Sequence, residues 1–521
     1  MSQMLKSSGA MGAATLLSRV LGMVREIVYA RFMGDGWVAG AFQLAFTIPN
    51  LFRRLLGEGA LTAAFIPIFK EKEKTASEAE MWRAANAVIS GLVVAAAAVI
   101  GLVLLGLSLA LALASFKPET RLMLELLRWM FPYMLLICLT AVFFGMLNSR
   151  GHFFVPALGA VVLNVVMIAV VLGLAPRWGA TLETQIFALA VGVLLAGAAQ
   201  MLFQLPTLRR EGFRFAWVSP WRNETVQRVV RQMIPGTIGV AAFQLNVVLT
   251  QGVAFWVDPQ IVASFNYAVR LMELPQGIFG VSLATFLLPT LAGLAAEKKM
   301  GEFRATLGQG LAHLIFVNGL MTVLLIALAE PMVRLLFERG QFTTESTQRA
   351  AFALVCLAPG LVAFSMVNIL ARAFYALGDT ATPMKISLVC LTLNLALTLV
   401  LVGPLRQGGL ALANALTSWL NVVLLFAALR RKQGALELGT AATKLWAVAA
   451  ALALAALAAW GCAQRWGIWF DAREQTIWLK LGAVFVPMTA ASAVYFAATL
   501  ALGVPSAREM LAMVRSRLSR R

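Results

Sequence analysis

The chain has 521 residues, of which 60% are hydrophobic and 13% are charged, and its formal net charge is +19. A soluble domain carries roughly 25% charged residues, so this composition excludes an ordinary water-soluble enzyme or binding module. Apolar runs recur from end to end, and the run 84–114 is too long for a buried core helix. These features predict an all-α protein that crosses a membrane many times.

The predicted spans are the apolar windows of sufficient length. A spanning helix needs ~20 apolar residues, and about fourteen windows meet this requirement. In chain order they are 9–31, 37–56, 87–115, 122–147, 155–175, 183–206, 231–257, 261–292, 307–329, 350–376, 382–403, 407–429, 442–464 and 477–501. An even number of spans places both termini on the same side of the membrane.

Basic residues gather in alternate connectors between these windows. The basic connectors are 70–74, 209–231, 298–304, 430–432 and the tail from 515 onwards. This is the positive-inside pattern, which predicts that both termini are cytoplasmic. It also accounts for the positive charge without a nucleic-acid partner.

Two connectors have the composition of interfacial segments. Residues 207–230 place Trp217 and Trp221 among arginines, which predicts a stretch at the cytoplasmic membrane surface. Residues 330–349 predict a short amphipathic helix on the outer face. Both are expected to anchor the protein rather than bind substrate.

The chain also repeats itself. Three positions recur at a constant offset of 227 residues, Pro132, Gly151 and Pro156 as Pro359, Gly378 and Pro383. Since this offset covers six predicted spans, it preserves orientation and predicts a parallel repeat, which is a signature of alternating-access transporters. Turns favour Pro and Gly, so chance is the alternative, but the shared register and equal span count argue against it.

The repeat predicts two six-helix lobes related by a pseudo-two-fold axis. The expected division is 1–206 for the N-terminal lobe, 207–230 for a linker, 231–432 for the C-terminal lobe, and 433–521 for spans 13 and 14 with a basic tail.

Charged residues inside the first span are candidates for a binding site. An ionised side chain at mid-bilayer costs ~2.5–3.5 kcal/mol on insertion scales, so it indicates function. One helical sector holds Ser18, Arg19, Gly22, Arg25 and Glu26. A solvated terminal turn would explain the pair Arg25 and Glu26, but not Arg19, which has apolar flanks.

Two other spans carry polar side chains that share a face. Asn50 and Arg53 lie three residues apart in the second span, and Asn266, Arg270 and Glu273 follow at helical spacing in the eighth. Arginine binds phosphate oxygens bidentately and stays charged, so these sets predict a cationic, anion-binding cavity. Structural ion pairs inside the membrane are the alternative.

The two glutamates have a separate role in this interpretation. Glu26 and Glu273 are expected to balance the arginine charge when no ligand is bound, while Ser18, Asn50 and Asn266 are possible cavity-lining residues.

The two histidines are far apart in the sequence and the four cysteines are scattered, so neither a metal site nor a His-based active site is predicted.

Several blocks resemble one transporter family. Residues 18–22 (SRVLG), 45–54 (AFTIPNLFRR), 57–60 (GEGA) and 64–67 (AFIP) are similar to the opening of the MurJ (MviN) lipid II flippases, and 270–277 (RLMELPQG) resembles their eighth span. The similarity runs essentially end to end. It implies the fold of the MOP exporter superfamily, in which two six-helix lobes form a V around a central cavity and two extra C-terminal helices form a groove for a polyprenyl tail.

The resemblance also implies a function. It implies a non-enzymatic flippase of the bacterial inner membrane that moves lipid II, an undecaprenyl-pyrophosphate-linked disaccharide-pentapeptide, to the periplasmic leaflet by alternating access. The family's essential arginines correspond to Arg19, Arg25, Arg53 and Arg270, and Glu26 is the acidic partner. Gly40 stands where the family commonly has Asp, which puts a role for that carboxylate in doubt.

The residues alone indicate only a transporter for a large anionic amphiphile. A flippase for another polyprenyl-pyrophosphate-linked glycan, of the O-antigen or exopolysaccharide type, remains the main alternative. A multidrug exporter of the same superfamily should have an acidic cavity, and a membrane-embedded glycosyl- or acyltransferase should have a catalytic base or metal-binding carboxylates. We expect membrane lipids and lipid II as partners, a monomer and no cofactor, with Na+, H+ or the membrane potential left open as the driving force.

Overall fold

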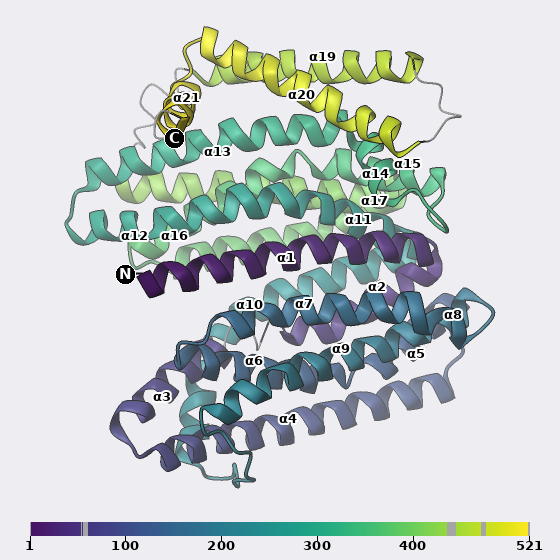
Figure 1. Ribbon diagram of the computed structural model, residues 1–521, viewed down its shortest axis with the longest axis vertical. Helices are drawn as coiled ribbons and strands as arrows, with labels where there is room; N and C mark the ends of the chain where they lie inside the picture. Colours follow the sequence, from purple (N-terminus) through teal and green to yellow (C-terminus); the bar gives the residue numbers. More distant parts are fainter. Residues whose placement is uncertain (1, 54, 56–60, 435–443, 470–475, 519–521) are drawn as a thin grey trace. The chain divides into compact units, whose positions relative to one another are not determined.

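The computed structural model describes residues 2–53, 55, 61–434, 444–469 and 476–518 of the chain. All regular structure in these ranges is helical (Figure 1), which confirms the predicted all-α class. The chain divides into two compact units, the first comprising Met1–Ala263 with Arg339–Phe342, and the second Ser264–Glu338 with Thr343–Arg521. The predicted lobe boundaries at 206 and 231 rest on the sequence repeat and stay a prediction.

The first unit is built from ten α-helices and one π-helix within its described residues. They are α1 (Ser2–Met33), α2 (Trp37–Phe52), α3 (Leu61–Thr75), α4 (Glu78–Leu113), α5 (Pro118–Met130), α6 (Tyr133–Ser149), α7 (Phe154–Ala169), η2 (Val170–Leu174), α8 (Ala175–Trp178), α9 (Leu182–Arg210) and α10 (Glu224–Val257). The next helix, α11 (Pro259–Pro275), begins in this unit and continues into the second.

The second unit contains the remaining described helices. They are η3 (Gln276–Val281), α12 (Ser282–Ala296), α13 (Met300–Ala327), α14 (Ala329–Phe337), α15 (Thr344–Leu357), α16 (Gly360–Ala376), α17 (Ala381–Gln433), α19 (Leu445–Trp469), α20 (Ile477–Ala501) and α21 (Pro505–Leu518). The long α17 is two helices that meet at Arg406, where φ of 48° and ψ of −125° interrupt the helix.

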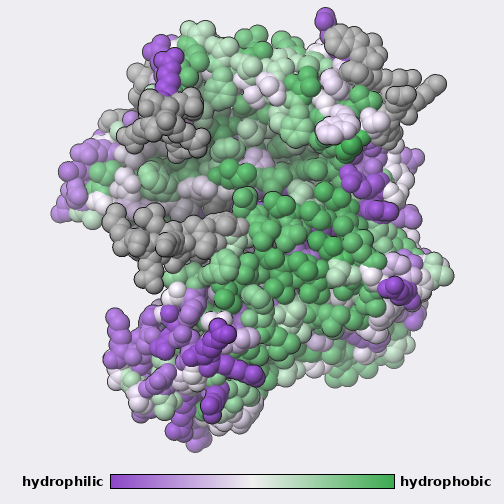
Figure 2. Space-filling model, viewed as in Figure 1, coloured by the Kyte–Doolittle hydropathy of each residue, from purple (hydrophilic) through white to green (hydrophobic). Residues whose placement is uncertain are grey.

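The helices have the length and surface of membrane spans. Within the described residues, eight helices are long and apolar enough to cross a bilayer, or ten if each bent pair counts as one span. Two shorter apolar helical stretches are Trp37–Phe52 and Ala241–Val257. Figure 2 shows hydrophobic residues along the sides of the helices and hydrophilic residues gathered near their ends, for example around α3. A polytopic membrane protein is therefore confirmed, while the number fourteen stays a prediction.

The repeat seen in the sequence corresponds to repeated local structure. Pro132 stands at a 42° bend between α5 and α6, and Pro359 stands at a 45° bend between α15 and α16. Both α6 and α16 have 17 residues and are followed by a glycine in the left-handed region, Gly151 at φ 85° and Gly378 at φ 73°. The same residue types thus break and end equivalent helices.

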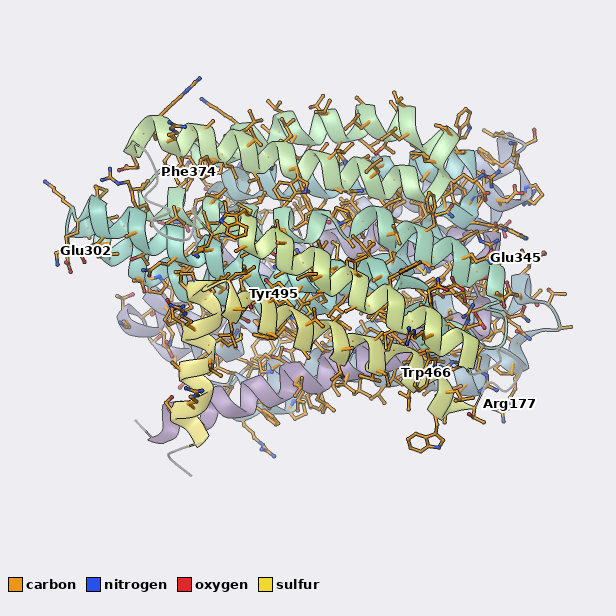
Figure 3. All side chains as sticks on the ribbon, turned by 90° about the horizontal axis from the view of Figure 1, so that it is seen from above. Arg177, Glu302, Glu345, Phe374, Trp466 and Tyr495 are labelled. Atoms are coloured by element: carbon orange, nitrogen blue, oxygen red, sulfur yellow. The ribbon has the colours of Figure 1, made fainter. Side chains whose placement is uncertain are left out.

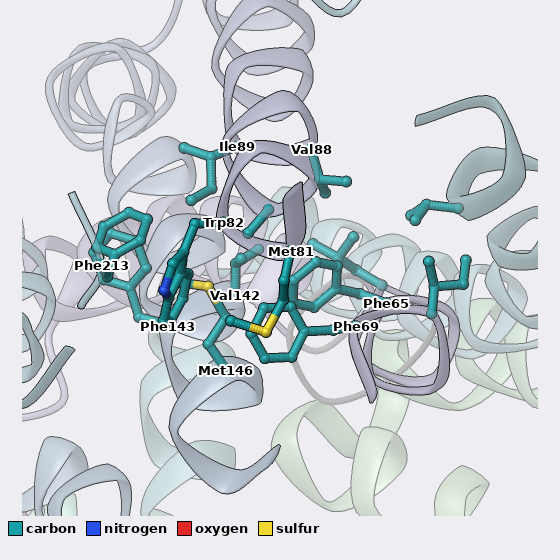
Figure 4. Packing of buried hydrophobic residues seen from close by; sticks show 14 of the residues in the cluster. Phe65, Phe69, Met81, Trp82, Val88, Ile89, Val142, Phe143, Met146 and Phe213 are labelled. Atoms are coloured by element: carbon teal, nitrogen blue, oxygen red, sulfur yellow. The ribbon is translucent and has the colours of Figure 1, made fainter. Parts of the chain in front are cut away.

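An aromatic cluster holds one end of the first unit together (Figure 4). The Phe69 ring lies 5.7 Å from that of Trp82, and Trp82 lies 5.5 Å from Phe213. These contacts join α3 and α4 to the segment between α9 and α10. The segment is further tied to α4 because Asn86 Nδ2 donates to the Arg214 carbonyl at 2.9 Å.

In the second unit, α19 and α20 pack on α13 (Figure 3). Glu302 and Glu345 lie at opposite ends of the helices, with Tyr495 between them. The buried Tyr495 hydroxyl donates to the Phe316 carbonyl at 2.8 Å. This hydrogen bond is needed because the hydrocarbon of the bilayer offers the hydroxyl no partner. Helices α19 and α20 are therefore an integral part of this unit.

Candidate substrate site

The first candidate group lies on α1. Arg25 Nη2 and Glu26 Oε1 form an ion pair at 2.5 Å, and their side chains are 14% and 9% exposed. The Arg25 guanidinium also lies over the Tyr29 ring, 5.4 Å from its centroid, in a cation–π contact. The buried Arg25 Nε has no hydrogen-bond partner among the described residues, so one donor of this guanidinium is unused.

Arg19 has a different environment on the same helix. It is exposed, and its neighbours Leu16 and Val20 are exposed as well, at 65% and 54%. Within the described part of the chain it forms no ion pair. The predicted sector of α1 therefore holds one paired arginine and one arginine that is available to an anion.

Ser18 and Gly22 face a neighbouring helix. The Ser18 carbonyl accepts a hydrogen bond from Asn164 Nδ2 of α7 at 3.2 Å. A Cβ added at Gly22 would lie 3.7 Å from the same Asn164 nitrogen, which is ordinary van der Waals contact. Gly22 thus contributes to the packing of α1 on α7.

The second candidate group lies near the end of α2. Arg53 Nε donates to Asn50 Oδ1 at 2.9 Å, so the two residues predicted to share a face do contact each other. Both side chains are half-buried. Pro49 lies inside α2, where it removes one backbone hydrogen bond of the helix.

Tyr133 joins these two groups and was not predicted. Its side chain is fully buried, and its hydroxyl has no hydrogen-bond partner within the described residues. The guanidinium groups of Arg25 and Arg53 both lie close enough to act on this hydroxyl electrostatically. A polar aromatic residue directly after the Pro132 break was the signal that could have identified it.

A row of aromatic rings links α1, α2 and α6 beside these arginines. Successive ring centroids are 6.1 Å apart for Tyr29 and Phe42, 6.2 Å for Phe42 and Phe46, and 6.0 Å for Phe46 and Tyr133. These rings provide an apolar wall, which strengthens electrostatic interactions by lowering the local dielectric constant.

The close packing of α2 on the start of α11 explains why position 40 is a glycine and not an acidic residue. A Cβ at this position would lie 2.0 Å from the Pro259 carbonyl oxygen, a distance that no real Cβ can adopt. The backbone at the start of α11 therefore occupies the space that an Asp side chain would need.

The third candidate group lies in the second unit. Arg270 Nη1 and Glu273 Oε2 form an ion pair at 2.8 Å, with side chains 41% and 44% exposed, and Asn266 is half-buried on the same helix. Directly after this pair, α11 changes into the π-helix η3, a distortion frequent at functional sites. Gly280 of η3 packs closely on Ser365, which accepts a hydrogen bond from Asn318 Nδ2 at 2.9 Å.

The predicted residues thus form two local groups in the first unit, one on α1 and one at the end of α2, and one group in the second. Among the described residues no set of three or more His, Cys, Asp or Glu side chains is placed to hold a metal ion. Arginines paired with single glutamates and flanked by aromatic rings are suited to binding an anion.

The profile of the lipid II flippase MurJ family matches residues 29–476. The chain belongs to this family. A probable lipid II flippase MurJ of Haemophilus influenzae is 34% identical over 437 residues, covering 80% of this chain and 84% of the relative. The lipid II flippase MurJ of Burkholderia cenocepacia is 34% identical over 474 residues, covering 89% and 90% of the two chains.

Solved structures of transporters share the fold of this chain. A lipid II flippase MurJ in an inward closed conformation aligns with a TM-score of 0.74 and 21% identity, over 94% of this chain and 99% of that one. An inward-facing MATE multidrug transporter of the MOP superfamily aligns with a TM-score of 0.66 and 15% identity, over 82% and 98%. The expected MOP exporter fold is confirmed.

Proposed function

We propose that this protein is a lipid II flippase of the bacterial inner membrane with both termini in the cytoplasm. It moves the undecaprenyl-pyrophosphate-linked disaccharide-pentapeptide from the cytoplasmic to the periplasmic leaflet. The observation that carries this proposal is membership of the MurJ family over residues 29–476. The arginines of the three candidate groups supply the chemistry that such a substrate needs.

In this proposal the residues that bind the pyrophosphate are the four arginines named from the sequence, Arg19, Arg25, Arg53 and Arg270. Each guanidinium presents a planar set of donors that fits phosphate oxygens and remains charged at any physiological pH. In the absence of substrate, Glu26 and Glu273 neutralise Arg25 and Arg270. The incoming pyrophosphate takes over these contacts, so the arginines keep anionic partners throughout the cycle.

Transport proceeds by alternating access, in which the binding residues open to one side of the membrane at a time. The membrane potential acts on charge with ~2.3 kcal/mol per 100 mV, which is sufficient to return an empty, net-positive site to the cytoplasmic side. Coupling to Na+ or H+ is the other possible driving force. A flipping rate that is unchanged when the potential is dissipated would exclude the electrical mechanism.

Other polyprenyl-pyrophosphate-linked glycans share the chemical group that the arginines recognise. They are therefore the second candidate substrate class, and only a substrate-specific assay separates them from lipid II. Membership of a transporter family leaves the transferase alternative without support.

The test is growth of a bacterium depleted of its own lipid II flippase. We expect this chain to restore growth, and we expect Arg19→Ala and Arg270→Ala to lose that activity while reaching normal membrane levels. Arg177→Ala is the matched control, because Arg177 belongs to none of the candidate groups. Failure of a well-inserted parent chain to restore growth would contradict lipid II as the substrate.

A further inference from the structure

The first unit contains an apolar groove that none of the candidate substrate-site residues lines. Its volume is about 220 Å³, and its walls come from α2, α3, α4, α6 and α10. The lining side chains are apolar apart from one thiol, that of Cys138. A groove of this kind in a membrane protein is suited to a hydrocarbon chain.

The groove follows α4 over the depth of one leaflet. The lining residues of α4 run from Val88 to Val99, and the 1.5 Å rise per residue gives a length of about 16 Å. This is about half of the ~30 Å hydrocarbon core. Ala95, Val99 and Val230 are exposed at its edge, so the groove opens sideways towards lipid.

One end of the groove lies at the segment that precedes α10. Val218 N donates to Ser90 Oγ at 3.3 Å, and a Cβ added at Gly91 would lie 3.3 Å from Pro220 Cβ. The next residues, Trp221 and Arg222, therefore stand where the groove begins. Trp221 is 76% exposed, as expected of a tryptophan at the membrane surface.

This end is positively charged. Between residues 214 and 231 the chain has four arginines and a single acid, Glu224. Arg228 is engaged with Glu71 through two hydrogen bonds of 2.7 Å, whereas Arg222 is exposed and has no ion-pair partner among the described residues. Arg222 is thus positioned to meet a lipid phosphate while the groove holds a chain of the same lipid.

We propose that this groove is a binding site for an anionic phospholipid of the cytoplasmic leaflet, separate from the transport site. One acyl chain lies along α4 against α10, and the headgroup phosphate contacts Arg222 beside Trp221. The fit of groove length to one leaflet favours an acyl chain over the undecaprenyl tail of the substrate, which is much longer. The proposal is independent of the transported substrate.

The test uses the full chain in vesicles of phosphatidylethanolamine with phosphatidylglycerol, part of which carries a photoreactive diazirine in one acyl chain. Peptide mapping after illumination should place the adducts on residues 88–99 and 226–233. Ala95→Phe fills the groove and should reduce this adduct by about tenfold, since several methylene contacts are lost. Ala97→Phe is the control, because Ala97 is exposed on another face of α4 and does not line the groove.

The headgroup contact is tested in the same assay. Arg222→Gln should abolish the preference for labelled phosphatidylglycerol over equally labelled phosphatidylethanolamine, and Arg177→Gln should leave that preference intact. Adducts spread evenly over exposed helix faces, with no loss in Ala95→Phe, would overturn the proposal. Displacement of the label by undecaprenyl phosphate but not by unlabelled phosphatidylglycerol would also overturn it, because the occupant would then be a polyprenyl tail.

Discussion

At the scale of single residues, the candidate site combines charges that the sequence reveals with neighbours that it does not. Arg19, Arg25 and Arg53 stand out because ionised side chains are costly inside apolar helices. Tyr133 carries no charge, so its only signal in the sequence was its place after Pro132, and the packing of its ring on Phe46 of α2 appears only in the fold. Its buried hydroxyl has no hydrogen-bond partner among the described residues, and we expect the substrate to supply one.

Tyr133→Phe tests this interpretation. The variant removes a hydroxyl that forms no hydrogen bond with any described residue, so thermal stability in detergent should be unchanged or slightly raised. If the hydroxyl binds the pyrophosphate, the rate of lipid II flipping should fall by about tenfold, which corresponds to the loss of one hydrogen bond to a charged group. Normal flipping in Tyr133→Phe would remove Tyr133 from the site.

Gly40 gives a second prediction at this scale. Gly40→Ala forces a Cβ towards the Pro259 carbonyl and should destabilise the protein by about 1–3 kcal/mol, the usual cost of overpacking. Gly36→Ala is the control, because a Cβ there meets nothing within 4 Å and its φ of −66° suits any residue. The measurement is the melting temperature in detergent. Equal melting temperatures for the two variants would contradict the close approach of α2 to residue 259.

At the scale of helices, the breaks and ends were predictable because they depend on local chemistry. Proline at 132 and 359 and glycine at 151 and 378 act through their own backbone, so their spacing showed the repeat directly.

The helix bounds within the segment 330–349 were less predictable. The sequence favoured one amphipathic helix there, but the structure divides it between α14 and the start of α15, because Thr343 caps a new helix by accepting from Ser346 N at 3.3 Å.

Ion pairs that join helix ends were also beyond prediction, since they connect distant parts of the chain. Arg150, which follows α6, donates to Glu211 after α9 at 2.8 Å and to Glu73 of α3 at 3.0 Å. Hydrogen bonds from His152 and Arg150 lower the pKa of Glu211 below its ordinary value of 4.5. Burial opposes the same shift at Glu73, but hydrogen bonds from Lys70 and Arg150 outweigh it, so the pKa of Glu73 is lowered as well.

This network predicts a pH dependence of stability. Carboxyl groups with a lowered folded pKa contribute stability that is fully present above pH 4.5 and is lost as the pH falls through their folded pKa. The melting temperature should therefore decrease as the pH is lowered below 4.5, and the decrease should be smaller in Arg150→Gln, which has less of this contribution to lose. A melting curve with the same pH dependence in both proteins would contradict the role of Arg150.

At the scale of the whole molecule, fold class and family were accessible from the sequence because both depend on patterns that extend over hundreds of residues. Apolar windows, alternate basic connectors and the repeat all agree with the MOP exporter fold. The space available at single positions, such as Gly40, was not accessible, because it depends on backbone segments brought together only by folding.

Lipid II flipping is tested most directly by the exposure of lipid II on the outer leaflet. In cells depleted of their own flippase and supplied with this chain, an externally added enzyme that cleaves lipid II reports how much has been flipped. We expect the parent chain and Arg177→Gln to restore cleavage, and Arg53→Gln to reduce it by at least about tenfold at equal membrane level. Restoration by Arg53→Gln to the level of the parent would contradict the arginine site, and no cleavage with the parent would contradict lipid II flipping itself.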